Sequence, residues 1–267
     1  MSQLYSFHTH TNWSDGYCSA EEMIRQAVNL GWKKIGISDH LIVHPMHNPG
    51  DNFRFPNFDK ALDAVRFHLQ EIRNTAKLFP EIKVYAGFEV DYFPLDGWIE
   101  EFHEFKKKID ADYYINGNHS VTDKSGIKCY EIYHYERYGL PDELTNEYFS
   151  NHFINMRNAV LSGEFTFLAH LDYARWSGLL NIDKYKDEIN GVISALKQTG
   201  MPTEINTKGH DSIGSFYPCP WILKELIAAN VPFVISDDAH HTSHLGRYFD
   251  EAESMLNDFG CTHHWSL

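Results

Sequence analysis

The chain has 267 residues, of which 43% are hydrophobic and 22% are charged, and its formal net charge is −14 at pH 7. This composition is typical of a soluble globular protein, and no apolar run approaches the ~20 residues that span a bilayer, so we expect no membrane partner. The negative charge argues against long nucleic acid as a partner, because proteins that grip a phosphate backbone usually carry basic stripes.

Short β-branched or aromatic runs alternate with longer helical patterns along the whole chain. This alternation is typical of repeated βα units and a mostly parallel sheet. No linker rich in Pro, Gly or Ser interrupts it, which predicts a single domain over residues 1–267. The seven predicted strands are Leu4–Phe7, Lys33–Ser38, Ile82–Phe88, Asp112–Asn116, Phe165–Ala169, Thr203–Asn206 and Pro232–Ser236.

The helices between these strands are predicted by apolar stripes with recognisable ends. In the first helix, Ser19 and Glu22 form a capping box, and Gly31 can end the helix. Similar stripes predict helices at 57–79, 97–108, 143–162, 183–199, 219–230 and 247–258.

The amino terminus and the cysteines indicate a reducing compartment. Residues 1–8 contain neither a basic segment nor a long apolar stretch, so we expect no secretory signal and a cytoplasmic location. The four cysteines lie far apart without a C-x-x-C pair, which argues against a zinc ribbon and a disulfide framework. We therefore expect free thiols.

Potential metal ligands follow almost every predicted strand. Because the carboxyl ends of parallel barrel strands converge on one face, residues far apart in sequence are expected to meet there. The ligand candidates in chain order are His8 and His10, Asp39 and His40, Glu89, His119, His170 and Asp172, Asn206 to His210, and Asp237 to His240.

An isolated histidine is more often a surface or core residue than a ligand. We assign that ordinary role to His44, His47, His68, His103, His134, His152, His263 and His264. His8-x-His10 differs, because alternation along an extended segment sends both imidazoles to one side, where they can bind one ion. H-x-H is a weak signal alone, and it gains specificity from the ligands that follow the other strands.

Glu89 is the natural bridge between two ions. It stands at the end of an apolar strand, where an unpaired carboxylate would be costly, and a carboxylate can link ions that would otherwise repel each other. The alternative is a salt bridge to a barrel Lys or Arg.

The motifs, taken in order, resemble those of the polymerase-and-histidinol-phosphatase (PHP) superfamily from residue 8 to about 240. They are His8-Thr9-His10, Ser14-Asp15-Gly16, Ser38-Asp39-His40, Gly87-x-Glu89, His119, His170-x-Asp172 and Ser236-Asp237-Asp238-Ala239-His240. The resemblance implies an α/β fold, a distorted (β/α)7 barrel with a metal cluster at the C-terminal ends of the strands.

The resemblance also implies two to three divalent ions (Zn, Mn or Fe) and assigns their ligands. The first ion would be held by His8, His10, Glu89 and Asp238, the second by Glu89, His119 and His170, and the third by Asp15, His40 and His240. Asp238 is preferred to Asp237 for its spacing to His240. Asp39 and Asp172 would orient the adjacent ligands.

Such a cluster indicates phosphate ester hydrolysis. Two ions roughly 3.5–4 Å apart can lower the pKa of a bridging water and direct hydroxide at phosphorus. Asp172, His210 or a metal-bound water could protonate the leaving group. The chain length and the segments Asn206-Thr207-Lys208 and Tyr217-Pro218 resemble the histidinol-phosphate phosphatases of histidine biosynthesis, which implies a small-molecule substrate, L-histidinol phosphate.

No basic residue follows Gly209 closely, where that branch would be expected to clamp the phosphate. The candidate substrate contacts near strand ends are Arg175, Lys208, His210 and Arg247.

Three alternatives remain. A PHP-type phosphoesterase acting on nucleotides or nucleic-acid ends would keep the metals and change the substrate. An amidohydrolase-like C–N hydrolase also opens with H-x-H, but commonly uses a carboxylated lysine that has no counterpart at a strand end here. A non-catalytic metal-binding domain is disfavoured by the completeness of the ligand set, because four ligands suffice to close a structural site.

Overall fold

The computed structural model of the protein describes residues 4–48, 53–178, 181–261 and 265–267, and the predictions for His263 and His264 lie outside them. The strands within these ranges are β1 (Lys34–Val43), β2 (Arg54–Phe55), β3 (Lys83–Val90), β4 (Tyr113–Asn116), β5 (Ser120–Thr122), β6 (Cys129–Glu131), β7 (Phe167–Leu168), β8 (Thr203–Asn206) and β9 (Phe233–Ser236). The α-helices are α1 (Ala20–Asn29), α2 (Phe58–Ala76), α3 (Trp98–Lys106), α4 (Asp142–Ser162), α5 (Lys186–Thr199), α6 (Lys208–Ile213), α7 (Pro220–Ala228) and α8 (Phe249–Asp258). Short 3₁₀ helices are η1 (Ile132–Tyr138), η2 (Tyr173–Ser177), η3 (Ile182–Tyr185) and η4 (Thr242–His244).

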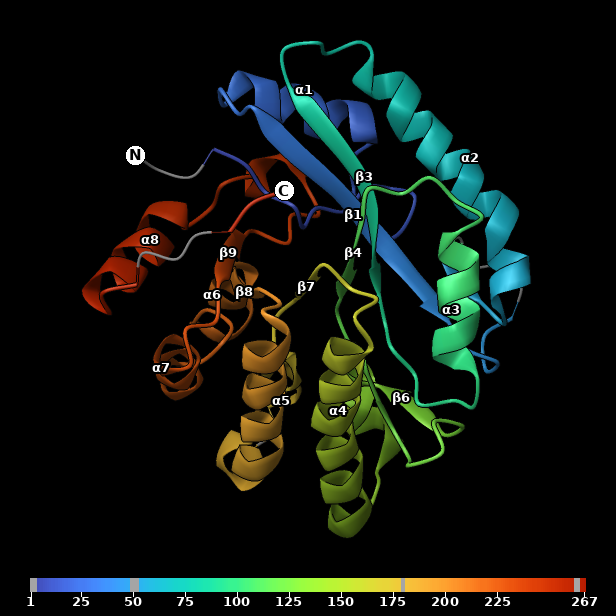
Figure 1. The fold of residues 1–267 in the computed structure, drawn as a ribbon, viewed down its shortest axis with the longest axis vertical. Coiled ribbons are helices and arrows are strands. Elements are labelled where there is room, and N and C mark those ends of the chain that lie inside the picture. The colour runs from blue at the N-terminus through green and yellow to red at the C-terminus, as the bar shows by residue number, and fades with distance from the viewer. Residues whose placement is uncertain (1–3, 49–52, 179–180, 262–264) are drawn as a thin grey trace.

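Seven strands form one sheet in the order β2-β1-β3-β4-β7-β8-β9, and every neighbouring pair is parallel. The helices lie around the outside of this sheet (Figure 1). Strands β5 and β6 form a separate antiparallel pair. The predicted α/β fold with a mostly parallel sheet is confirmed.

The predicted first strand, Leu4–Phe7, is wrong as a regular strand, and the short β2 is the seventh strand of the sheet. The residues just beyond it still bond both to β1 and to the chain after β9. Ser38 of β1 donates its backbone N–H to Thr9 O at 2.8 Å, and Thr9 forms a parallel bridge with Ala239, after β9. Pairing does not continue there because the preceding Asp238 has a φ of 47°, which interrupts an extended strand.

The predicted helices agree with the structure to within a few residues. The capping box of α1 is confirmed, since the Ser19 side chain accepts from Glu22 N and the Glu22 carboxylate accepts from Ser19 N at 2.8 Å. Gly31 follows the helix with a φ of 78°. The sequence did not predict α6 or the β5–β6 pair, because both are short and lack a sustained apolar period.

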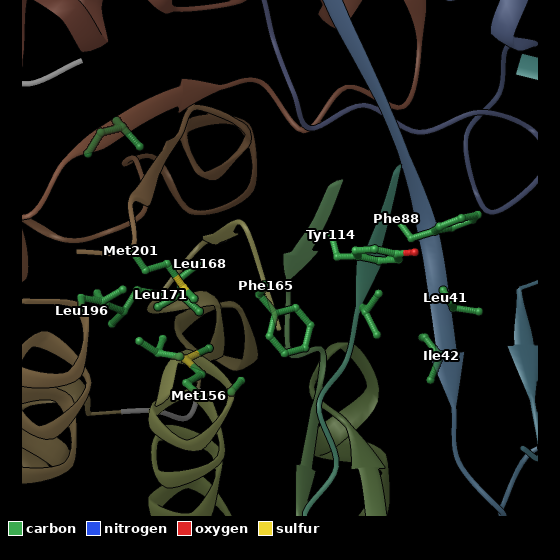
Figure 2. Close-up of a cluster of buried hydrophobic side chains, with 14 of the residues drawn as sticks. Leu41, Ile42, Phe88, Tyr114, Met156, Phe165, Leu168, Leu171, Leu196 and Met201 are labelled. Atoms are coloured by element: carbon green, nitrogen blue, oxygen red, sulfur yellow. The ribbon is translucent and has the colours of Figure 1, made fainter. Parts of the chain in front are cut away.

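Two buried clusters lie on opposite faces of the sheet. The larger one fills the space between the sheet and the surrounding helices, and Figure 2 shows part of it, with Met156 of α4 and Leu168 of β7 among its labelled members. The smaller cluster consists of Phe7, Tyr85, Tyr113, Ile115, Phe167, Ala169 and Val234.

Strand alternation connects the smaller cluster to the ligand candidates. Tyr85 of β3 belongs to that cluster, and Gly87 and Glu89 follow it at period two, so all three face the same side. Only glycine fits at position 87, because a Cβ there would overlap Tyr113. The apolar cluster therefore occupies one end of this face, and Glu89 stands at the carboxyl end of its strand.

The expected free thiols are confirmed, since Cys18, Cys129, Cys219 and Cys261 are all unbonded and buried. Within the described ranges, none of the helices combines the length and the apolar content that a membrane span requires.

Candidate metal centre

The Glu89 carboxylate lies among five imidazoles. Its Oε1 is 2.8 Å from His170 Nε2 and 3.5 Å from His119 Nε2, and its Oε2 is 3.0 Å from His40 Nδ1, 3.1 Å from His8 Nε2 and 3.4 Å from His10 Nε2. Glu89 is fully buried. Among the described residues its ion-pair partners are these histidines, and no Lys or Arg is among them, so the geometry does not support the alternative of a structural salt bridge.

Many polar atoms in this cluster lack a hydrogen bond. The buried atoms concerned are Glu89 Oε2, His8 Nε2, both ring nitrogens of His10, His40 Nδ1 and His170 Nδ1. Buried polar groups in proteins are nearly always paired, and each exception calls for an explanation. Imidazole nitrogens and carboxylate oxygens are the ligands that transition metals prefer, so this donor set fits divalent ions.

The ligand atoms form four overlapping groups whose members lie within 4.8 Å of one another. These groups are His10, Asp15, His40 and His240; His8, Glu89 and His170; His8, His10 and Asp238; and His40, Glu89 and His119. All nine residues predicted as ligands are therefore brought together. The grouping differs from the expected one in that His8, His10 and His40 each belong to two groups, and in that His119 and His170 fall into different groups.

Asp238, not its neighbour Asp237, faces the cluster. Asp238 Oδ1 lies 3.3 Å from His10 Nε2 and 3.4 Å from His240 Nδ1. Asp237 turns away and accepts a hydrogen bond from Ser6 Oγ at 2.8 Å. Burial raises the pKa of Asp237 to about 6, although its hydrogen bonds act in the opposite direction.

Two carboxylates that the sequence analysis did not select support the ligand histidines. Glu204 Oε1 lies 2.8 Å from His8 Nδ1, and Asp91 Oδ1 lies 2.9 Å from His119 Nδ1. A carboxylate on the far ring nitrogen fixes the tautomer and orientation of a ligand imidazole. The sequence did carry a signal for each of them. Glu204 is a charged residue inside an otherwise uncharged strand, and Asp91 follows Glu89 by two residues.

Asp39 and Asp172, expected to orient adjacent ligands, form their hydrogen bonds elsewhere. Asp39 accepts from His68 and from the loop after His10. Burial raises the pKa of Asp39, but the hydrogen bonds from His68 and Ser14 outweigh it and lower the value to about 2.

Asp172 accepts hydrogen bonds from Arg175 Nη1 at 3.0 Å and from Cys219 N at 2.8 Å. Its burial raises its pKa. These contacts join η2 to the start of α7 and do not reach a ligand imidazole.

Electrostatics within the cluster favour an ionised Glu89 and a neutral His10, but not a neutral form of every ligand. Burial raises the pKa of Glu89, but the charges of His8, His119 and His40 outweigh it and hold the value well below the usual range. Burial and the neighbouring His240 and His40 lower the pKa of His10 to about 3. An ionised carboxylate and a neutral imidazole are the forms that bind a metal. Burial lowers the pKa of His8 and of His40, but nearby carboxylates, Glu89 among them, outweigh it and raise both values well above the usual range. These two imidazoles would therefore release a proton on binding a metal.

Gly117 leaves the space that the Glu89 carboxylate occupies. A Cβ at Gly117 would overlap Glu89 Oε1 and the carbons next to it. Gly117 directly follows β4, the neighbour of β3, so this close approach depends on parallel pairing of the two strands. The position therefore tolerates no side chain without displacing the proposed bridge.

A cavity of about 640 Å³ opens over the cluster. The candidate ligands on its wall are Asp15, His40, His119 and His240, and its aromatic residues include Tyr17, Phe53, Tyr133, Tyr173 and Trp176. Two cations, Arg54 and Lys208, also line it. The cavity combines metal ligands, flat apolar surfaces and positive charge, which suits a small anionic molecule that carries a ring.

Of the predicted substrate contacts, only Lys208 lines this cavity, and its Nζ lies 3.1 Å from Asp238 Oδ1. The other three are engaged outside it: Arg175 donates to Ser215 Oγ, Arg247 Nη1 donates to Asp211 Oδ2 at 2.6 Å, and the His210 ring packs 4.2 Å from that of Tyr248. Arg54 was missed because β2, only two residues long, has no sequence signature.

The fold and the site together define an α/β protein with a cluster of His, Asp and Glu side chains suited to several metal ions at the carboxyl ends of its strands. Residues 6–208 match the family model of the PHP domain. The chain belongs to the PHP domain family, and the resemblance found in its motifs is confirmed.

Two curated relatives cover almost the whole chain. The probable histidinol-phosphatase of Deinococcus radiodurans is 23% identical over an alignment of 265 residues that covers 97% of this chain and 95% of the relative. The probable histidinol-phosphatase of Thermotoga maritima is 25% identical over 258 residues, 96% of this chain and 92% of the relative.

Two solved structures share the fold. The histidinol phosphate phosphatase of Lactococcus lactis, complexed with Zn, L-histidinol and phosphate, is 18% identical with a TM-score of 0.72, over 97% of this chain and 95% of that one. The putative histidinol phosphatase of Listeria monocytogenes is also 18% identical, with a TM-score of 0.67 over 92% of this chain and 99% of that one.

Proposed function

We propose that this protein is a metal-dependent phosphatase that hydrolyses L-histidinol phosphate to L-histidinol and phosphate. The observation that carries the proposal is the buried Glu89 carboxylate, which lies among five imidazoles, two of them, His40 and His119, on the wall of the cavity. The names of the two curated relatives and the ligands of the Lactococcus lactis structure favour histidinol phosphate among phosphate esters.

The nine ligands support two to three divalent ions, drawn from Zn, Mn and Fe. Glu89 would bridge the ion near His8 to the ion near His119 and His170. Asp15, His40 and His240 would hold a third, and the geometry adds His10 to that group. When bound, such ions neutralise charge on phosphoryl oxygens and lower the pKa of a coordinated water.

The chain itself supplies a cation next to these ligands. Lys208 Nζ lies 3.1 Å from Asp238 Oδ1 and 3.4 Å from His240 Nε2, at the wall of the cavity. Its ammonium is placed to bind a phosphate oxygen. Of the proton donors considered from the sequence, Asp172 and His210 are not among the residues that line the cavity, which favours a water as the donor to the leaving oxygen.

Aromatic rings continue from the cluster into the cavity. The Tyr173 ring lies 5.1 Å from that of His119 and 6.2 Å from that of Trp176, and Tyr133 lies 5.5 Å from Trp176. Ring separations in this range are typical of favourable aromatic contacts. This row of rings can bind the imidazole of histidinol phosphate while its phosphate reaches the cluster.

A substrate panel tests the proposal. Phosphate release would be measured for histidinol phosphate, sugar phosphates, mononucleotides and an aryl phosphate, with metal content determined on the same protein. We expect histidinol phosphate to have the highest kcat/KM. A higher value for a mononucleotide or sugar phosphate would reject the substrate and leave a phosphatase, and phosphate release from none of them by metal-loaded protein would reject the activity.

A further inference from the structure

We propose that His68, a residue of α2 outside the ligand set, is a positioning residue for the third metal position. Through Asp39 it holds the loop that carries Asp15, and so determines whether Asp15, His40 and His240 can bind an ion together. This inference rests on the proposed metal centre. It assigns a role to a histidine that the sequence analysis treated as an ordinary core residue.

The first link is a fully buried carboxylate with four donors. His68 Nε2 lies 2.8 Å from Asp39 Oδ2. Asp39 also accepts from Thr11 N at 2.6 Å, from Thr11 Oγ1 at 2.7 Å and from Ser14 Oγ at 2.6 Å. Three of the four donors belong to the loop after His10, and the fourth comes from α2, so Asp39 ties this loop to the helix.

His68 has a second contact with the same loop. The indole of Trp13 stacks on the His68 ring at 4.3 Å with an interplanar angle of 7°, and Phe88 of β3 packs beside both rings, 5.8 Å from Trp13 and 6.1 Å from His68. His68 is only 3% exposed. The imidazole therefore restrains the loop in two ways, through the Asp39 carboxylate and through the indole of Trp13.

Asp15 depends on the loop for its position. Its carboxylate lies 3.2 Å from His240 Nε2 and 3.4 Å from His40 Nε2, while its side chain is 44% exposed. Its remaining hydrogen-bond partner among the described residues is Ser14 Oγ, at 3.3 Å. This carboxylate also lies 3.8 Å from His10 Nδ1, and it has little support apart from its three histidines, so the backbone of the loop sets its direction.

Strand alternation connects this support to the metal side. Asp39 and His40 are consecutive residues of β1, so their side chains point to opposite faces of the sheet. Asp39 faces α2 and the loop, and His40 faces Glu89. A change at His68 therefore reaches two ligands of the same position, Asp15 through the loop and His40 through its neighbour in the strand.

The variant His68→Phe removes the N–H donor and keeps an aromatic ring for stacking on Trp13. We expect the affinity for the third ion to fall ~10–100-fold, the range typical of lost support for a metal ligand. At limiting zinc this loss appears as one ion fewer per chain, the same deficit as in Asp15→Ala. His68→Gln, which restores an N–H donor near the same place, should recover part of the affinity.

Two further variants keep the test independent of folding. Ser14→Ala removes one donor to Asp39 and the hydrogen bond to Asp15 at a half-buried site outside the core, and should also lower the affinity for the third ion. His44→Phe is the control, because it removes another buried imidazole, whose Nε2 bonds Gly126 O at 2.6 Å, without contact to the loop. It should lower the melting temperature and leave ion content unchanged.

Metal per chain, measured by mass spectrometry after dialysis against limiting zinc, decides between the outcomes, with thermal melting recorded for each variant. Loss of an ion from Asp15→Ala but not from His68→Phe would overturn the positioning role, whatever the result for Ser14→Ala. Equal ion loss from the control His44→Phe would also overturn it. Full ion content in Asp15→Ala would overturn the third metal position itself, and the role of His68 with it.

Discussion

Glu204 Oε1 lies 2.8 Å from His8 Nδ1, with both side chains fully buried, so that the opposite nitrogen of His8, Nε2, faces Glu89 Oε2 at 3.1 Å. The second oxygen of Glu204 accepts from His170 N at 2.8 Å. One carboxylate from β8 thus orients one ligand imidazole and the backbone of another. Neither residue that it supports is close to it in sequence.

Glu204→Gln is expected to weaken metal binding ~10–100-fold, because the amide supports His8 less strongly and does not fix its tautomer. A competition titration with a zinc chelator measures the change. Glu164→Gln is the matched control, since Glu164 pairs with Lys106 at the periphery. Equal zinc affinity in the two variants would contradict the supporting role of Glu204.

Glu89→Gln is expected to lower metal content at two positions together and to eliminate most turnover, because the amide cannot bridge two ions. Its effect on folding should be modest. The measurements are metal per chain, phosphate release and thermal melting. A large fall in melting temperature with unchanged metal content would instead identify Glu89 as a structural ion-pair residue.

Asp15→Ala and His40→Ala are each expected to remove about one ion per chain and to lower kcat/KM. The double variant should be no worse than either single one, because residues that act as a unit are not additive. Metal analysis and steady-state kinetics measure both effects. Wild-type metal content and wild-type kcat/KM in both single variants would refute the third position.

Gly117→Ala is expected to displace the Glu89 carboxylate and to reduce metal content and turnover, because the added Cβ would overlap Oε1. Gly191→Ala is the control. Its Cβ would meet only Arg157 Cδ, at an ordinary 3.5 Å, and alanine within α5 should stabilise the protein by roughly 0.5–1 kcal/mol. The idea fails if Gly117→Ala binds metal as the wild type does.

Removal of metal by a chelator is expected to abolish phosphate release and lower the melting temperature, because ions that bind only the folded state stabilise it. Addition of Zn or Mn should restore both. Thermal melting and phosphate release, recorded before and after reconstitution, test this. Full activity in protein shown to be metal-free would remove the basis of the proposed mechanism.

The sequence by itself predicted the main helices and six of the seven sheet strands, and the resemblance of its motifs to the PHP superfamily assigned the nine candidate ligands. Both rest on local signals. Alternating and helical apolar periods depend on residues within one element, and most of the candidate ligands lie at or shortly after the end of such an element, as Glu89 does near the end of β3. The one strand that was wrong, Leu4–Phe7, has the right extended local pattern, but its continuation forms only a single bridge at Thr9.

The tertiary structure decided which side chains support the ligands and which face the cavity. Glu204 and His8 are 196 positions apart, and His68 and Asp39 are 29 apart, so no local period relates them. Their contacts depend on the register of neighbouring strands and on how helices pack against the sheet. The same packing places Lys208 on the wall of the cavity and pairs Arg175 and Arg247 with other residues outside it. The surroundings of a side chain are set by elements that are distant in the chain.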